Sequence, residues 1–289
     1  MSATVFCDRP CELGEGALWH PLRGQLFWFD ILGRRLLTRT EEGPAEWAFP
    51  EHASAAGWID ADHLLIATET ALRRFHIPSG EHERVADLDA RDPSTRSNDG
   101  RADPAGGFWI GTMGKAAEPG AGGIHRYHRG AVETLFPGLT IPNAICFAPD
   151  GRTAYFADTT ERRIRRVALD AEGWPVGAPE TFVDREMEIE AFKAKGLNPD
   201  GAVVDAEGGL WNAQWGAGRV ARYHPDGRFD RAIAVGGRHA SCPAFGGPEL
   251  RTLFVTTARE GLTDPDPAQG LTYRAEPGAA GLPEPAIRI

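Results

Sequence analysis

The feature that most constrains the fold of this chain is an internal repeat. A short apolar strand, a turn containing Asp, Pro or Gly, and a second strand rich in aromatic residues recur six times. The copies read LGEGALWHPLRGQLFWFD, ASAAGWIDADHLLIAT, SNDGRADPAGGFWIGT, PNAICFAPDGRTAYFAD, NPDGAVVDAEGGLWNAQW and SCPAFGGPELRTLFVTT. Most copies begin about 40–45 residues after the one before, and a third strand can often be read after each. We therefore predict an all-β fold, a six-bladed β-propeller with four-stranded antiparallel blades, in preference to an all-β sandwich.

The rest of the chain fits a closed ring of such units. The 35 Gly and 22 Pro among 289 residues supply the turns that many short strands need. We expect one domain over residues 1–289, in which TVFCDR closes the ring beside the last repeat. One interval is longer and contains FVDREMEIEAFKAKGLN, about residues 182–198, which we interpret as a short helix or a covering loop. The tail AEPGAAGLPEPAIRI ends in a short apolar strand candidate.

Charge and composition limit the partners of the protein. The 31 Lys and Arg against 41 Asp and Glu give a net charge of −10, which argues against nucleic acid or an anionic membrane as the main partner. No apolar run approaches the roughly 20 residues that span a bilayer, and the N-terminus has no secretory pattern. Four cysteines in a chain of this length do not form a disulfide framework. We expect a cytoplasmic monomer that binds a small molecule.

The repeat brings distant polar residues to one place. The innermost strand of each blade lines the central channel, so the residues that open these strands meet at one face. Two of these positions hold Ala55 and Cys242, and the other four hold Glu15, Asn98, Asn143 and Asp200. Carboxylate and amide oxygens in a partly dry channel favour a hard divalent cation, calcium, magnesium or manganese. Position alone leaves open whether the cation serves catalysis or ligand binding, only joins the blades, or is replaced by buried water.

In each blade the chain runs from the channel mouth to the far side along the first strand and returns to the mouth along the second. The loops after the second strands therefore lie on the same face as these residues. Five segments are therefore expected to frame the site: Asp30–Arg34, Met113–Gly122, Asp158–Arg163, Trp215–Gly218 and Thr257–Gly270. Together they form a cup suited to a small polar molecule. Trp215 either packs between blades or contacts the ligand.

The repeats also carry a family resemblance. The segments LGEGALW, RSNDGRADPAGGFWIGTM, PNAICFAPDGRTAYFAD, PDGAVVDAEGGLW and FGGPELRTLFVTTAREGL resemble, in this order, the blade signatures of the senescence marker protein/gluconolactonase (regucalcin-like) family of six-bladed propellers. Within that family the chain looks most similar to bacterial sugar-lactone hydrolases. The resemblance implies metal-dependent hydrolysis of a sugar lactone, such as a pentono- or hexonolactone, to the open-chain aldonic acid in sugar oxidation.

The resemblance also assigns residues. It implies that one divalent metal ion (calcium, zinc, manganese, magnesium or iron) is held by Glu15 of LGEG, Asn143 of PNA and Asp200 of PDG. It implies that the sugar is contacted by Arg96 and Asn98 of the R-x-N-D-G segment and by Glu118 of the loop after GTM.

A mechanism follows from these assignments. The metal would polarise the lactone carbonyl and stabilise the oxyanion, and Asp200 would accept a proton from the attacking water. Asp99 either orients a neighbouring amide or is a turn residue of SNDG. Two other functions stay open. One is a related metal-dependent esterase or organophosphatase, for which a more apolar mouth is expected; the other is a non-catalytic calcium-binding or protein-interaction propeller.

Overall fold

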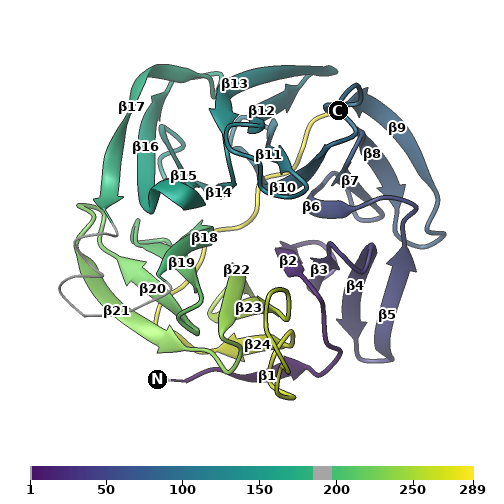
Figure 1. Ribbon diagram of the computed structural model, residues 1–289, viewed down its shortest axis with the longest axis vertical. Helices are drawn as coiled ribbons and strands as arrows, with labels where there is room; N and C mark the ends of the chain where they lie inside the picture. Colours follow the sequence, from purple (N-terminus) through teal and green to yellow (C-terminus); the bar gives the residue numbers. More distant parts are fainter. Residues whose placement is uncertain (1, 185–196) are drawn as a thin grey trace.

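The computed structural model describes residues 2–184 and 197–289 and is built almost entirely of β-strands. The one helix among these residues is the 3-10 turn η1 (Thr159–Glu161). Four separate four-stranded antiparallel sheets stand around a common centre (Figure 1). Their strands, sheet by sheet, are β2 (Gly14–His20), β3 (Gln25–Asp30), β4 (Arg35–Thr40) and β5 (Gly43–Ala48); β6 (Ala53–Trp58), β7 (His63–Thr68), β8 (Ala71–His76) and β9 (His82–Asp87); β10 (Thr95–Ala102), β11 (Phe108–Gly114), β12 (Gly122–His128) and β13 (Ala131–Leu139); and β14 (Pro142–Phe147), β15 (Thr153–Asp158), β16 (Arg163–Leu169) and β17 (Pro175–Asp184).

The remaining strands form an eight-stranded sheet with two halves. The first half is β18 (Asn198–Val204), β19 (Leu210–Trp215), β20 (Arg219–Tyr223) and β21 (Phe229–Ala234), and the second is β22 (His239–Gly246), β23 (Thr252–Ala258), β24 (Thr272–Ala275) and β1 (Thr4–Cys7). The pair Trp215 and His239 joins β19 to β22. Because β1 pairs with β24, the N-terminal segment lies beside the last repeat, as the sequence predicts. This radial arrangement of antiparallel sheets is consistent with a β-propeller.

Every innermost strand has a register shift near its beginning. A β-bulge bends a strand locally and redirects the side chains beside it. The shifts fall at Glu15/Leu18, Ala53/Ala55, Ser97/Gly100, Asn143/Cys146, Pro199/Ala202 and Ala240/Pro243. The polar residues that the repeat aligns therefore lie at equivalent irregularities, which explains how a regular strand can present them to the centre of the ring.

The core lies between neighbouring sheets. Trp28, Trp109 and Trp211 occupy equivalent second strands and are all fully buried. The cluster around Trp109 combines residues of its own sheet with Ile145 and Phe156 of the next. Packing of this kind holds adjacent sheets at a fixed angle, so the innermost strands keep their positions around the channel.

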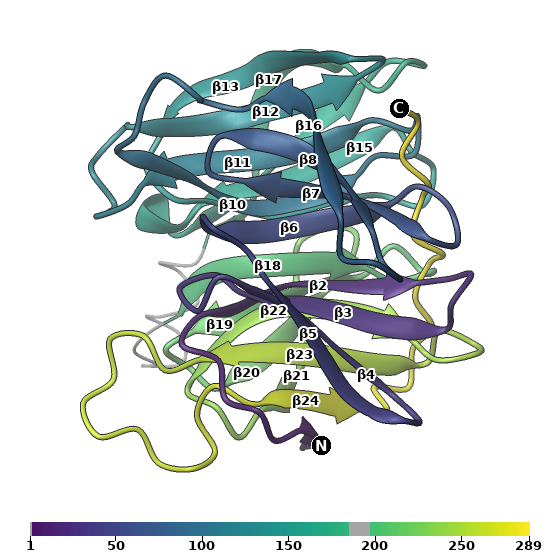
Figure 2. The same ribbon diagram turned by 90° about the vertical axis from the view of Figure 1, so that its right-hand side faces the viewer.

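The two faces of the ring differ. The loop between β23 and β24 projects from one face, and the C-terminal tail, residues 276–289, runs across the opposite face (Figure 2). We call these the loop face and the tail face. The predicted apolar strand at the end of the tail does not form, and the tail has only an isolated bridge at Gly281. Proline at positions 277, 283 and 285 removes backbone donors that a strand would need.

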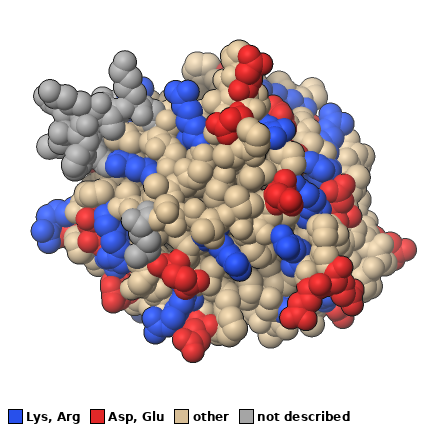
Figure 3. Space-filling model, turned by 90° about the horizontal axis from the view of Figure 1, so that it is seen from below, with Lys and Arg blue, Asp and Glu red and all other residues tan. Residues whose placement is uncertain are grey.

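The predicted insertion can be compared with the structure only in part. The insertion over residues 182–198 lies mostly outside the described residues, although its beginning, Phe182–Asp184, continues β17. Within the described ranges there is no helix of the length and apolar character required to cross a membrane. Acidic and basic side chains are interspersed on the side of the molecule seen in Figure 3, in keeping with the absence of a strongly basic composition.

Candidate functional site

A cavity of about 370 Å³ opens on the loop face, where the innermost strands begin. Its lining contains five of the seven residues predicted from sequence: Glu15, Arg96, Asn98, Asn143 and Asp200. Four of the five expected loops contribute, whereas Asp30–Arg34 supplies none of the described lining residues. The contributing residues are Met113, Lys115, Ala116 and Ala117 of one loop, and Thr159, Trp215 and Glu260 of the others. The volume is in the range of small-molecule sites.

The other two predicted residues lie outside this lining. Asp99 is buried behind it, and its carboxylate accepts the backbone N–H of Ile145 over 2.8 Å. It therefore joins β10 to β14, two residues from Asn143. Glu118 is exposed, and its carboxylate turns back to accept the N–H of Ala116 over 3.1 Å. The contact of Glu118 with substrate stays a prediction.

Glu15 and Asp200 form a buried carboxyl pair. Each residue is about 5% exposed, and the two carboxyl groups lie close enough for each to shift the pKa of the other. Burial, together with the charge of Asp99, raises the pKa of Glu15 to about 8. Burial and the charge of Glu15 raise the pKa of Asp200 well above its usual range. Two such groups require either a shared proton or a positive charge between them.

The donor chemistry of this pair fits a hard divalent cation. Asn143 adds an amide oxygen from β14, so the three side chains offer only oxygen atoms. Cys242, which lies within the register shift of β22, is buried, and burial raises the pKa of its thiol well above the usual value. It therefore stays protonated and adds no thiolate. No group of three His, Cys, Asp or Glu residues suited to a metal occurs in the described parts of the chain, so any cation here needs the amide.

A chain of hydrogen bonds crosses the floor of the cavity. Arg96 Nη1 donates to Asn98 Oδ1 over 2.8 Å, and Asn98 Nδ2 donates to Asn143 Oδ1 over 3.1 Å. Asn143 Nδ2 donates to Thr159 Oγ1 over 2.8 Å, and that hydroxyl donates to the carbonyl of Pro199 over 2.7 Å. We call this series the amide chain. It connects β10, β14 and the first turn of η1 to β18.

Thr159 is a lining residue that sequence reasoning did not single out. It lies in the predicted framing segment Asp158–Arg163, so its general location is readable from the repeat. Its partner Pro199 is 40 residues away, and nothing in the sequence marks that contact.

Charged and aromatic groups surround the mouth of the cavity. Arg96 is buried, and burial lowers its pKa although Glu260 and the carboxyl pair attract its charge. It remains a cation, since arginine starts from a pKa above 12. Trp215 lines the cavity and also stacks on His239, with ring centroids 4.2 Å apart and planes 16° apart. Trp215 therefore packs against β22 from a position in the cavity lining, and its contact with a ligand stays a prediction.

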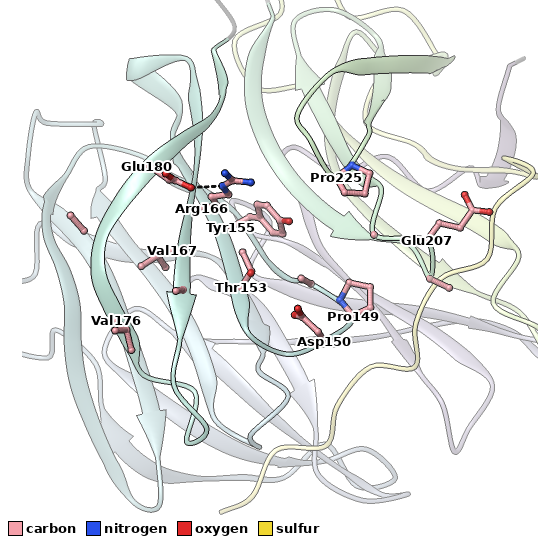
Figure 4. Close-up of a pocket in the computed structure, with 15 residues that line it drawn as sticks. Pro149, Asp150, Thr153, Tyr155, Arg166, Val167, Val176, Glu180, Glu207 and Pro225 are labelled. Atoms are coloured by element: carbon pink, nitrogen blue, oxygen red, sulfur yellow. Dashed lines mark hydrogen bonds and ion pairs between the residues drawn. The ribbon is translucent and has the colours of Figure 1, made fainter.

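A larger cavity of about 660 Å³ lies elsewhere, between the sheets β14–β17 and β18–β21 (Figure 4). Arg166 and Glu180 in its lining form an ion pair of 2.7 Å, and Glu207 pairs with Arg222 over 3.0 Å. Asp150 caps an exposed turn by accepting the N–H of Arg152 over 2.9 Å. This cavity has no buried carboxyl pair, so the smaller cavity on the loop face is the better candidate for chemistry.

Known proteins share both the sequence and this architecture. Residues 13–259 match the family described as SMP-30/Gluconolactonase/LRE-like region. The chain is 38% identical over 291 residues to an L-arabinolactonase of Azospirillum brasilense, which covers 97% of this chain and 93% of the relative. It is 36% identical over 294 residues to a pentonolactonase of Haloferax volcanii, with 98% and 97% covered. The crystal structure of a calcium-binding protein, regucalcin, from Agrobacterium tumefaciens is similar with a TM-score of 0.94 and 41% identity, covering 100% of this chain and 98% of that one.

Proposed function

Because the chain belongs to the SMP-30/gluconolactonase/LRE-like family, we propose that it hydrolyses the intramolecular ester of a sugar lactone to the open-chain aldonic acid. The supporting observation is the cavity on the loop face, where a buried carboxyl pair adjoins Arg96 and two amides. The names of the pentonolactonase and L-arabinolactonase relatives favour a pentonolactone, and a hexonolactone is the other candidate. A polyol suits this lining better than an apolar ester, because the lining offers charged and amide groups to hydroxyls.

The architecture that goes with this proposal is a six-bladed propeller forming one domain over residues 1–289. We interpret the eight-stranded sheet as two blades, since one residue pair, Trp215 and His239, joins its halves. With the four separate sheets, this interpretation makes six blades around one channel. The central position of the cavity is then the natural meeting point of residues from different repeats.

We further propose that the site holds one divalent cation between Glu15, Asn143 and Asp200. The structural relative from Agrobacterium is named a calcium-binding protein, and calcium, zinc, manganese, magnesium and iron are the ions to test. When bound, such an ion polarises the lactone carbonyl and offsets negative charge on its oxygen.

The protein's own groups perform the remaining steps. Water attacks the lactone carbonyl carbon, and a carboxylate oxygen of Asp200 accepts the proton that the water loses. The bond from that carbon to the ring oxygen breaks, and the proton returns to the ring oxygen, which becomes the new hydroxyl. Arg96 donates hydrogen bonds to the sugar. Asn98 uses both Nδ2 hydrogens internally, toward Pro142 and Asn143, and its oxygen accepts from Arg96, so it can bind a sugar hydroxyl only through the second lone pair of that oxygen.

The test is proton release by chelator-stripped protein in a pH-stat, with glucono-, galactono-, xylono- and arabinonolactone, before and after each metal is added. We expect metal-dependent acid release that Asp200→Asn and Glu15→Gln abolish. Asp150→Asn is the matched control, because the same tripeptide Pro-Asp-Gly occurs at 149–151 and at 199–201, but Asp150 lies on an exposed turn. Metal binding without acid release from any lactone would refute the proposal and favour another ester substrate or a non-catalytic binding protein.

A further inference from the structure

We infer that Thr159 is a positioning residue, which holds the amide of Asn143 with its oxygen available to the cation and fixes it relative to Asp200. The inference rests on the proposed cation site. It concerns a residue that lies in the cavity lining and contributes neither a carboxylate nor an amide of its own.

At the Pro199 end of the amide chain, hydrogen-bond chemistry fixes which group donates and which accepts. A backbone carbonyl can only accept, so the Thr159 hydroxyl must use its single hydrogen toward Pro199, 2.7 Å away. The hydroxyl oxygen can then only accept from Asn143, 2.8 Å away. An amide NH₂ group is the one part of the Asn143 side chain that can donate. Its nitrogen must therefore face Thr159.

The other end of the amide chain leads to the same orientation. A guanidinium group has donors only, so the Arg96 contact requires the oxygen of Asn98 at 2.8 Å. The Asn98 nitrogen is then the atom that donates to Asn143, which must present its oxygen at 3.1 Å. A carbonyl oxygen has two lone pairs, so after this bond one remains for a cation. If the amide were rotated by 180°, two NH₂ groups would face one another and the cation would meet a donor.

Thr159 itself is held firmly. Its backbone N–H donates to the carbonyl of Ile141 over 3.0 Å, and Asp158 caps η1 by accepting the N–H of Thr160 over 3.1 Å. Asp158 also accepts the N–H of Thr140 over 2.7 Å. The turn is therefore anchored to the segment that leads into β14.

The hydroxyl of Thr159 thus lies between two proposed ligands from different sheets. On one side it binds the side chain of Asn143 in β14, and on the other the carbonyl of the residue immediately before Asp200 in β18. A single hydroxyl sets both the orientation of one ligand and its distance from the other. Outer partners of this kind commonly affect metal affinity by about 10–100-fold.

The experiment measures calcium and manganese binding to chelator-stripped protein by isothermal titration calorimetry. Thr159→Val keeps the shape and removes the hydroxyl, and we expect it to weaken binding about 10–100-fold. Thr159→Ser should restore the wild-type affinity. Thr160→Val is the matched control, because the Thr160 hydroxyl donates to Asp158 over 2.8 Å and does not line the cavity.

Repeating the Thr159 substitution in an Asn143→Asp variant tests whether Thr159 acts by orienting the Asn143 amide or only by supporting the local structure. In Asn143→Asp both ends of the side chain are oxygens, so the orientation no longer matters, and adding Thr159→Val should change the affinity much less than it does in the wild-type chain. An equal loss in both backgrounds would contradict the inference. So would a folded Thr159→Val protein that binds as tightly as wild type, while the cation site itself would stand. If Thr159→Val melts early, Thr159→Ala replaces it in the same series. Failure of the wild-type protein to bind either ion would refute both the cation site and this role.

Discussion

Gly16, directly after the carboxylate Glu15, is the position where a single methyl group should disturb the fold most informatively. Its backbone has a φ of +58°, a left-handed conformation. Its N–H also donates to Glu15 Oε2 over 3.1 Å. A Cβ added here would lie 2.1 Å from the backbone oxygen of Ser54 and 2.8 Å from the ring of Phe29. We therefore expect Gly16→Ala to force β2 and β6 apart.

The backbone conformation alone does not exclude a side chain. Ala144, in the equivalent place after Asn143, has a φ of 58° and carries a Cβ without harm to its strand. Left-handed backbone costs an L-residue about 1–2 kcal/mol, and overpacking of a close-packed site costs a further 1–3 kcal/mol or so. For Gly16→Ala both terms apply, so the loss should be about 2–5 kcal/mol. The backbone of Ser54 cannot easily move, because its hydroxyl is bonded to the Asn98 carbonyl over 2.6 Å.

Gly24→Ala provides the matched control. Gly24 has nearly the same φ, +60°, but a Cβ there would meet no atom within 4 Å. It should therefore lose only the backbone term, about 1–2 kcal/mol. Urea unfolding followed by tryptophan fluorescence measures both variants, and the difference between them isolates the contacts with Ser54 and Phe29. Equal losses in the two variants would refute the reasoning, because they would show that β6 yields to the added methyl group at no cost.

Two further predictions concern buried charges. Arg101 and Glu284 form a buried ion pair between β10 and the tail. Because Arg101→Leu leaves a buried carboxylate unpaired, it should lower the free energy of unfolding by about 3–5 kcal/mol in urea, and adding Glu284→Leu should recover much of that loss. If the double variant recovers nothing, the broken ion pair is not the cause of the loss. Burial lowers the pKa of His125 below 6.5 although Asp89 lies 3.8 Å away, so the folded ring stays neutral while the unfolded chain takes up a proton. The free energy of unfolding should therefore fall as the pH drops below about 6.5, by at most about 1.4 kcal/mol per pH unit from this group. His125→Gln should make the free energy of unfolding depend less steeply on pH. An unchanged slope would show that other groups cause the pH dependence.

Much of the site was predictable because each repeat is the same structural unit. Glu15, Asn143 and Asp200 are far apart in the chain, yet the phase of the repeat brings all three to the register shift of an innermost strand. Glu15 and Asn143 precede the shift at the same position, whereas Pro199 holds that position in β18 and Asp200 comes one residue later. A feature that depends on contacts between repeats is different. The orientation of Asn143 requires Thr159 and Pro199, and no periodic pattern encodes a hydrogen bond between a loop hydroxyl and a carbonyl 40 residues later. The direction of the Glu118 side chain likewise depends on how its own loop closes.

The phase of the repeat aligns Ala55 and Cys242 with the polar residues, but the strand register does not. Ala53 and Ala240 precede the register shifts of β6 and β22, and Ala55 and Cys242 come later in each strand. Ala55 lies against Gly100, where an added Cβ would approach the Ala55 Cβ to 3.3 Å. Cys242 lies against Gly201, where an added Cβ would be 3.0 Å from its sulfur. These contacts join β10 and β18, which carry Asn98 and Asp200, to β6 and β22, and they leave room only for small side chains. The residues that align with Asn98 and Asp200 in β6 and β22 are Ser54 and Ser241, and both hydroxyls donate to a neighbouring innermost strand, Ser54 to the carbonyl of Asn98 over 2.6 Å and Ser241 to the carbonyl of Gly14. In these two sheets the polar position of the repeat therefore joins strands, whereas in β10 and β18 it supplies side chains to the cavity.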